Sequence, residues 1–183
     1  MKKLRNILMI AAVSALSNII STPISAQTDK ATTIKLIEGK NFVFNATTAS
    51  PTNTPEINAI FSKMPGSLAG GVINLAGSTY SVSVDKDSVE ANLPYYGRSF
   101  NAPRNLNDGG IKVSGGNFSY KADKKKKGNY IVVVKPGDSK GDVLSMTFFI
   151  TETGYATLNV VSNYRQAISY NGYISDPAKL ASK

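Results

Sequence analysis

The residues of this sequence best suited to binding are two tyrosines and two arginines. Tyr95, Tyr96 and Arg98 follow Pro94 in one short run, and Arg165 lies far along the chain. Aromatic rings and planar guanidinium groups bury a large area at a small cost in conformational entropy. If the two runs meet across a sheet, their guanidinium groups would suit a carboxylate or phosphate ligand. In the structural alternative, Pro94 ends a strand, one tyrosine packs in the core, and Arg98 pairs with a carboxylate or backbone carbonyls.

Composition removes most routes to catalysis. The 183 residues include no Cys, His or Trp, so a disulfide, a thiolate metal site, a catalytic cysteine and a histidine-based triad are all excluded. Two facing carboxylates would suit glycoside hydrolysis. Most of the 12 acidic residues, however, fall in polar segments such as 85–87 and 138–142, where turn chemistry explains them. The segment 138–142 also lacks the acidic spacing of a calcium loop. We therefore expect a protein that is not an enzyme and that has no metal site and no cofactor.

Four consecutive lysines, Lys124–Lys127, suggest a site for a polyanion. They lie between Tyr120 and Tyr130, where a hairpin needs a solvated loop, and lysines at a sheet edge also oppose aggregation. Aromatic residues that would stack on bases are not interleaved with the lysines. We therefore favour a solvated hairpin loop and expect no nucleic-acid partner.

The first 26 residues have the pattern of a secretory signal peptide. Lys2, Lys3 and Arg5 precede an apolar stretch, and small residues near Ala26 occupy the positions that a signal peptidase reads. Cleavage is predicted between Ala26 and Gln27. An uncleaved membrane anchor is the alternative, but polar residues interrupt the segment before it reaches the ~20 apolar residues that a span requires.

Residues 27–183 are expected to form a single exported β-rich domain. Three of the 21 basic residues and none of the 12 acidic residues precede the cleavage point, so cleavage lowers the formal net charge from +9 to +6. A lipid anchor requires a cysteine at the cleavage site, so we expect a protein that is not lipid-anchored and is periplasmic or secreted. The run Asp87–Val89 is similar to a sequon for periplasmic O-glycosylation, which makes Ser88 a candidate acceptor.

From Val72 onward, apolar and polar residues alternate with the two-residue period of β-strands. Leu144, Met146, Phe148 and Ile150, for example, are expected to share one buried face. The links between strands are too short for parallel crossovers, so consecutive strands should pair antiparallel. The sequence predicts a mainly β fold (α+β at the margin), an antiparallel meander of about 7–8 strands that forms a curled sheet or a barrel.

One or two short helices are expected near the N-terminus. The first begins at Thr28 or Asp29 and ends at Gly39, with this glycine as a left-handed cap. A strand over 41–46 should place Phe42 and Phe44 on one face. A second helix is predicted over 55–64, where Pro occupies the first helical position.

Three stretches of the chain together resemble the exported bacterial family known as domain of unknown function 4251. They are Leu93–Arg98, Gly109–Ile111 and Asn163–Gly172. The resemblance extends over roughly Lys35–Ile174, and it implies an exported, envelope-associated, mostly β domain without an assigned reaction. The segment Pro55–Gly71 departs from the family's pattern.

These observations lead to three hypotheses of function. The first is a non-catalytic binding or accessory module of the cell envelope, in which Tyr95, Tyr96, Arg98 and Arg165 line a surface or a barrel mouth and bind an envelope glycan, lipid or protein. The second is an envelope-glycan hydrolase that uses paired carboxylates. The third is a structural module that adds a partner's strand to a long free sheet edge without Pro or Lys.

Overall fold

The computed structural model describes residues 28–52, 59–60, 63, 67–68, 71–101, 109–137 and 142–180. The expected signal peptide over 1–26 and its cleavage point at Ala26 and Gln27 lie outside these residues. Seven of the ten residues of the helix expected over 55–64 also lie outside them. Within the described part of the chain, no helix is both long enough and apolar enough to cross a membrane.

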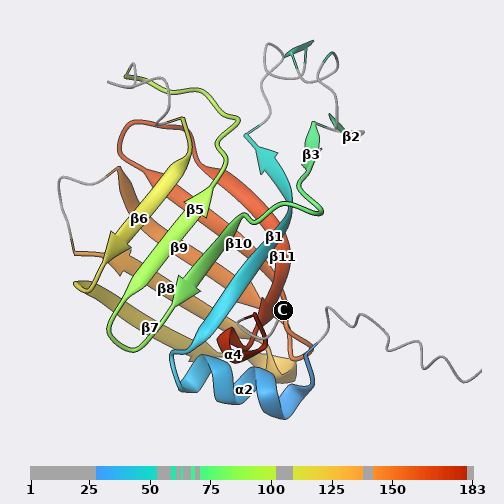
Figure 1. The fold of residues 1–183 in the computed structure, drawn as a ribbon, viewed down its shortest axis with the longest axis vertical. Coiled ribbons are helices and arrows are strands. Elements are labelled where there is room, and N and C mark those ends of the chain that lie inside the picture. The colour runs from blue at the N-terminus through green and yellow to red at the C-terminus, as the bar shows by residue number, and fades with distance from the viewer. Residues whose placement is uncertain are drawn as a thin grey trace, which may run out of the picture.

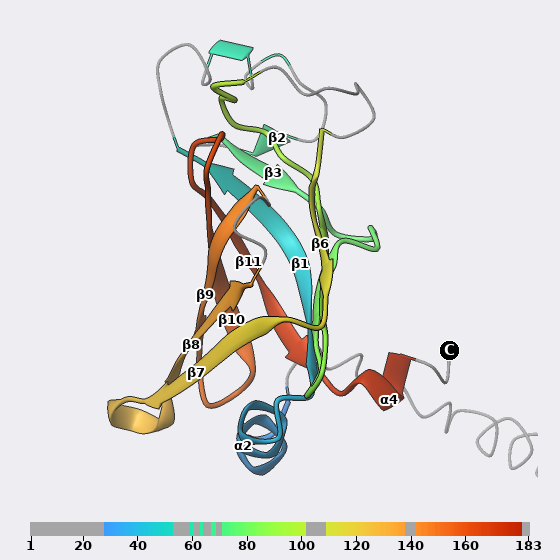
Figure 2. The same ribbon diagram turned by 90° about the vertical axis from the view of Figure 1, so that its left-hand side faces the viewer.

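One antiparallel sheet curls into a nearly closed barrel (Figures 1 and 2). Two short strands, β2 (Ser67–Leu68) and β3 (Val72–Asn74), extend it beside the first long strand. The prediction of a mainly β, antiparallel curled sheet or barrel is confirmed. The main path of the sheet consists of β1 (Phe42–Pro51), β4 (Ser81–Val84), β5 (Val89–Leu93), β6 (Ile111–Gly115), β7 (Phe118–Lys124), β8 (Tyr130–Pro136), β9 (Val143–Ile150), β10 (Tyr155–Ser162) and β11 (Ile168–Ser175).

The strand order departs from a simple meander. The order is β6-β5-β4-β1-β11-β10-β9-β8-β7, so β1 pairs with the last strand and the consecutive strands β6 and β7 lie at the two ends. The prediction that consecutive strands pair is therefore wrong for β1 with β2, for β3 with β4, and for β6 with β7 across the link over 114–116. There the chain turns out of one wall of the barrel into the other, and β7 takes β8 as its partner instead (Figure 2). We call the gap between the unpaired edges of β6 and β7 the open seam.

Alternate residues of the strands point into the barrel and form its core. Phe42 and Phe44 lie on one face of β1, as predicted. Both are fully buried and pack edge-on against Phe148, with ring centroids 5.6 and 5.8 Å from that of Phe148. The alternation is equally regular in β5, where Val89 and Leu93 are buried. The barrel interior is thus packed with side chains contributed by both walls.

A β-bulge corrects one expectation about the core. Leu144 was expected to face inward with Met146, but 48% of its surface is exposed. The pairing between β9 and β10 shifts register here: Ser145 pairs with Val161, whereas the next residue of β10 pairs with Val143. Leu144 is the extra residue, so Val143 takes the core position in its place.

Helix α2 (Lys30–Glu38) covers one end of the barrel. Asp29 caps its N-terminus by accepting a hydrogen bond from the Thr32 amide at 3.0 Å. Gly39 ends the helix as predicted but is not left-handed: its φ is −75°, and Lys40 adopts the positive φ of 49°. Gly39 is required for space, since a Cβ there would lie 2.7 Å from the Lys35 carbonyl oxygen. A short C-terminal helix, α4 (Pro177–Leu180), was not predicted.

Candidate binding site at the barrel mouth

The two sequence runs singled out for binding meet at the end of the barrel opposite α2 (Figure 1). Ser99, which follows the first run, forms an isolated antiparallel bridge with Arg165. The Gln166 amide donates to the Arg98 carbonyl at 3.0 Å, and the Phe100 amide donates to the Tyr164 carbonyl at 2.7 Å. The turn after β5 is therefore held against the loop between β10 and β11.

Tyr95 organises the turn after β5. Its hydroxyl group donates to the Arg98 carbonyl at 2.8 Å and lies 3.1 Å from the Gln166 carbonyl. The ring folds back over Gly97, where any Cβ would overlap the Tyr95 hydroxyl group. Burial raises the pKa of Tyr95, and the nearby Arg165 guanidinium opposes that increase. Tyr95 thus remains a neutral hydrogen-bond donor.

The Arg165 side chain, only 13% exposed, joins three separate segments. Its Nε lies 3.0 Å from Asp142 Oδ2, at the start of β9. Its Nη1 donates to the carbonyls of Gly109 and Gly110, just before β6, at 3.0 and 2.9 Å. Its guanidinium carbon also lies 5.1 Å from the centre of the Tyr95 ring. Because β6 and β9 belong to opposite walls, this side chain bridges the barrel where backbone pairing is missing.

Tyr96 and Arg98 play different parts from those of Tyr95 and Arg165. Tyr96 packs partly buried against the core, and burial raises its pKa. Arg98 is exposed and contributes its backbone carbonyl to the turn. The sequence suggested a single ligand position between two guanidinium groups. The structure does not provide this position, because the Arg165 guanidinium group is already bonded to Asp142 and to backbone carbonyls.

A pocket of about 270 Å³ opens beside this cluster, and we call it the mouth pocket. Sequence reasoning identified Tyr95 and Arg165 but missed Asp142 and Tyr164, whose proximity arises only in the folded chain. Asp142 had been assigned to a turn, and its Oδ1 is buried without a hydrogen-bond partner in the described part of the chain. Tyr164 is 47% exposed at the rim. The lining residues are Tyr95, Gly97, Ser99, Asn101, Gly109, Asp142, Tyr164 and Arg165.

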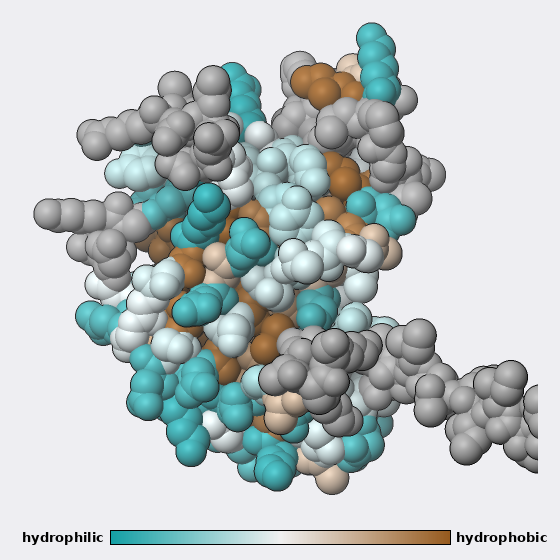
Figure 3. Space-filling view, in the orientation of Figure 1, coloured by the Kyte–Doolittle hydropathy of each residue, from teal (hydrophilic) through white to brown (hydrophobic). Residues whose placement is uncertain are grey.

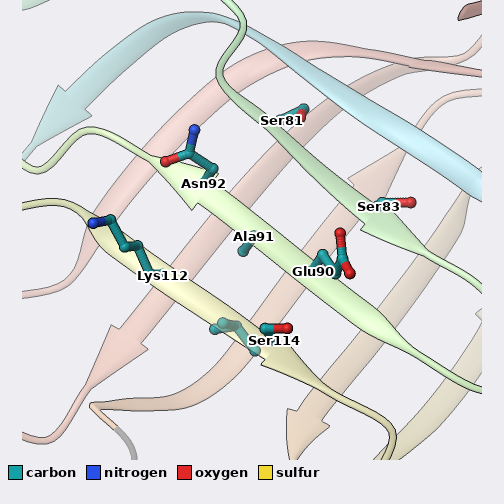
Figure 4. Close-up of a pocket in the computed structure, with 8 residues that line it drawn as sticks. Ser81, Ser83, Glu90, Ala91, Asn92, Lys112 and Ser114 are labelled. Carbon is teal, nitrogen blue, oxygen red and sulfur yellow. The ribbon is translucent and has the colours of Figure 1, made fainter.

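Two other hollows lie on or near the strands beside the open seam. The larger, about 510 Å³, is an open depression on the outer face of β4, β5 and β6 (Figure 4). Two cross-strand rows line it, Ser81–Asn92–Lys112 and Ser83–Glu90–Ser114. The smaller, about 190 Å³, lies between β6 and the ends of β8 and β9, and Asp142 lines it as well as the mouth pocket.

The remaining sequence candidates occupy turns and edges. Lys124–Lys127 forms the end of β7 and the tight turn to β8, so the prediction of a hairpin loop is confirmed. Ser88 lies half-buried in the turn between β4 and β5, where its carbonyl accepts from the Asp85 amide at 2.8 Å. The free edges of β6 and β7 carry Lys112 and Lys121, unlike the lysine-free edge that strand addition would favour.

The fold and the site define a small, mainly β domain whose antiparallel sheet forms a nearly closed barrel with a pocket at one mouth. The chain belongs to the family described as domain of unknown function (DUF4251), whose model matches residues 25–174. It is similar in fold to the crystal structure of a DUF4251 family protein from Bacteroides eggerthii, with 14% sequence identity and a TM-score of 0.50. That match covers 82% of this chain and 89% of the other. No curated protein matches the chain.

Proposed function

We propose that the protein is an exported, non-catalytic binding module of the cell envelope whose mouth pocket takes a neutral, hydroxyl-rich ligand such as a glycan unit. The observation that supports this proposal is the pairing of Arg165 with Asp142 beneath a rim that includes Tyr164. The pair brings one positive and one negative charge into the pocket, so neither a free carboxylate nor a phosphate gains a net attraction there.

The other lining groups suit the same kind of ligand. Ser99 and Asn101 supply hydroxyl and amide groups, while Tyr164 exposes an aromatic ring beside them. Aromatic rings give large apolar contact area, and polar side chains around them fix the orientation of a ligand. A sugar ring offers both an apolar face and several hydroxyl groups, so it matches both parts of the lining.

The pocket favours binding over hydrolysis. Glycoside hydrolysis needs two carboxyl groups at opposite sides of the scissile bond. Among the described lining residues, Asp142 is the one carboxylate, and Arg165 bonds it through Oδ2. We therefore place the envelope-glycan hydrolase second and the strand-adding module third.

A thermal-shift screen tests the proposal. The protein is heated with peptidoglycan fragments, neutral and acidic glycans, fatty acids and bile salts. A ligand present at a hundred times its Kd stabilises the folded state by about 2.7 kcal/mol, which raises Tm by roughly 5–10 °C in a chain of this length. Neutral glycans are expected to give the largest increase.

Two tyrosines provide a matched pair of variants for the screen. Tyr164→Ala removes the exposed ring at the pocket and should abolish the increase in Tm. Tyr155→Ala removes a ring of similar exposure at the start of β10, outside the pocket lining, and should retain the increase. Absence of any increase across the screen, or equal loss in both variants, would refute the mouth pocket as a binding site.

Export is tested separately on protein recovered from the cells that make it. N-terminal sequencing should begin at Gln27, and the culture fraction that contains the protein distinguishes the periplasm from the medium. The intact mass should equal that of residues 27–183, with an added glycan if Ser88 is modified. An N-terminus at Met1 would contradict cleavage after Ala26.

A further inference from the structure

A concentration of lysines covers the end of the barrel that α2 closes. Figure 3 shows hydrophilic side chains along the lower edge of the molecule, where Figure 1 places α2 and β7. All eight of these lysines are exposed. We call this surface the basic end, and its lysines are Lys30, Lys35, Lys40, Lys121, Lys124, Lys125, Lys126 and Lys127.

Specific contacts hold the helix and the β7–β8 hairpin together, which makes the basic end one continuous surface. The Tyr120 hydroxyl group donates to the Ile37 carbonyl at 2.7 Å, and the Tyr130 hydroxyl group donates to Glu38 Oε1 at 3.0 Å. At the tip of the hairpin, a Cβ on Gly128 would lie 3.6 Å from Lys30 Cε. Both ends of the helix therefore lie against the hairpin.

The carboxylates of this region are fewer than the lysines and are engaged locally. Asp29 caps α2, and Glu38 accepts the hydrogen bond from Tyr130. Asp123 pairs with a lysine on its own strand at 3.4 Å, and Glu152 pairs with the first lysine of α2 at 2.8 Å. On the helix and the hairpin, eight lysines against these four carboxylates leave an excess of four positive charges. The β4–β5 turn at the same end adds Asp85, Lys86 and Asp87, which lowers the excess to three.

The remaining lysines face outward. The ammonium groups of Lys40 and Lys124 lie 5.5 and 5.8 Å from the ring centres of Tyr120 and Tyr130. Lys35 and Lys125–Lys127 have no ion pair within the part of the chain that the structure describes. Lys127 has a φ of 62° in the turn at the hairpin tip.

We propose that the basic end binds the protein to a membrane surface that bears anionic lipid headgroups. Lysine ammonium groups are mobile point charges that suit phosphates distributed in a plane, rather than one carboxylate held in fixed geometry. The surface is formed by a helix and a hairpin tip, which is a protruding shape rather than a groove for a polymer chain (Figure 2). Tyr120 and Tyr130 cannot stack on bases, because their rings lie against the protein under lysine ammonium groups.

Vesicle co-sedimentation tests this proposal independently of the mouth pocket. The full protein is mixed with vesicles of phosphatidylcholine alone or with a third of phosphatidylglycerol, at low and high salt. We expect sedimentation with the anionic vesicles at low salt and its loss at high salt, because salt screens the attraction. Failure to sediment with the anionic vesicles at low salt would overturn the proposal.

Two triple variants of equal net charge separate local binding from overall charge. Lys125→Gln, Lys126→Gln and Lys127→Gln together should weaken vesicle binding by about a hundredfold, given the contribution of each lysine near an anionic surface. The control changes three exposed lysines elsewhere, Lys63, Lys112 and Lys135, to Gln and should bind almost as the natural protein does. Circular dichroism and the unfolding midpoint should be unchanged in both variants, since the lysines are exposed.

The remaining outcomes also decide the question. Equal loss of binding in both triple variants would mean that net charge, not the basic end, governs the interaction. Retention on heparin without binding to vesicles would identify a soluble polyanion as the partner. Either result would overturn the membrane proposal.

Discussion

Replacement of Arg165 by alanine tests whether one side chain holds the two walls of the barrel together near the mouth. The variant loses the ion pair with Asp142 and both hydrogen bonds to the carbonyls of Gly109 and Gly110. Within the described residues, no backbone ladder joins β6 to the wall that contains β9, although the backbone bonds between the turn after β5 and the loop between β10 and β11 remain in the variant. Asp142, whose Oδ1 is already buried without a hydrogen-bond partner among the described residues, then retains a poorly solvated charge.

The expected loss of stability follows from burial. Loss of one partner from a fully buried ion pair costs about 3–5 kcal/mol. Asp142 keeps 26% of its side chain exposed, so water screens part of the charge that remains. We therefore expect Arg165→Ala to lower the free energy of unfolding by about 2–4 kcal/mol, or roughly 5–15 °C in Tm for a chain of this length.

Urea unfolding followed by circular dichroism measures this change. Arg98→Ala is the matched control, because it removes an exposed arginine from the same turn and should alter the free energy of unfolding by less than about 0.5 kcal/mol. Arg165→Lys should recover part of the loss, since lysine restores a charge but not the planar, divergent donors. In a double-mutant cycle, Asp142→Asn should reduce the effect of Arg165→Ala. Equal effects of Arg165→Ala and Arg98→Ala would refute the reasoning.

Three further predictions concern the core and the sheet. Burial raises the pKa of Tyr170 well above its unfolded value near 10, so the folded state keeps this proton when the unfolded chain loses it. The free energy of unfolding should therefore fall as the pH rises above about 10, and it should fall less steeply in Tyr170→Phe. Tyrosinate absorbance follows this titration. A Cβ on Gly172 would overlap a carbonyl oxygen of β1, so Gly172→Ala should yield little folded protein on gel filtration, whereas Gly115→Ala, with open space around it, should fold normally. Leu144→Ser should change the urea midpoint little because this residue is bulged out, whereas Met146→Ser should cost at least about 2 kcal/mol.

The sequence was most informative where one strand face is buried. Alternation alone identified Met146, Phe148 and Ile150 as the inward face of β9, because a polar side chain at those positions would lose its hydration. The bulge at Leu144 could not be foreseen, because an apolar residue at an alternate position carries no sign of a register shift. The sequence also could not show that β1 pairs with β11, because pairing between strands so far apart in the chain leaves no local signal.

The sequence also predicted part of the candidate site. Tyr95 and Arg165 stand out by residue type, and the structure brings them together. Asp142 follows a glycine in a polar segment and looks like an ordinary turn residue until the fold sets it beside Arg165. Only knowledge that the start of β9 meets the loop before β11 would have paired these two charges.

The ladder between β1 and β11 decides when the chain can fold. It joins Val43 to Ser175, 132 residues apart, and pairs one edge of β1, whose other edge pairs with β4 and β3. Contacts of such long range form late and slowly, because a large loop must close first. A chain that ends before Ile168 would leave β1 and β10 as unpaired edges, so we expect it to aggregate rather than fold.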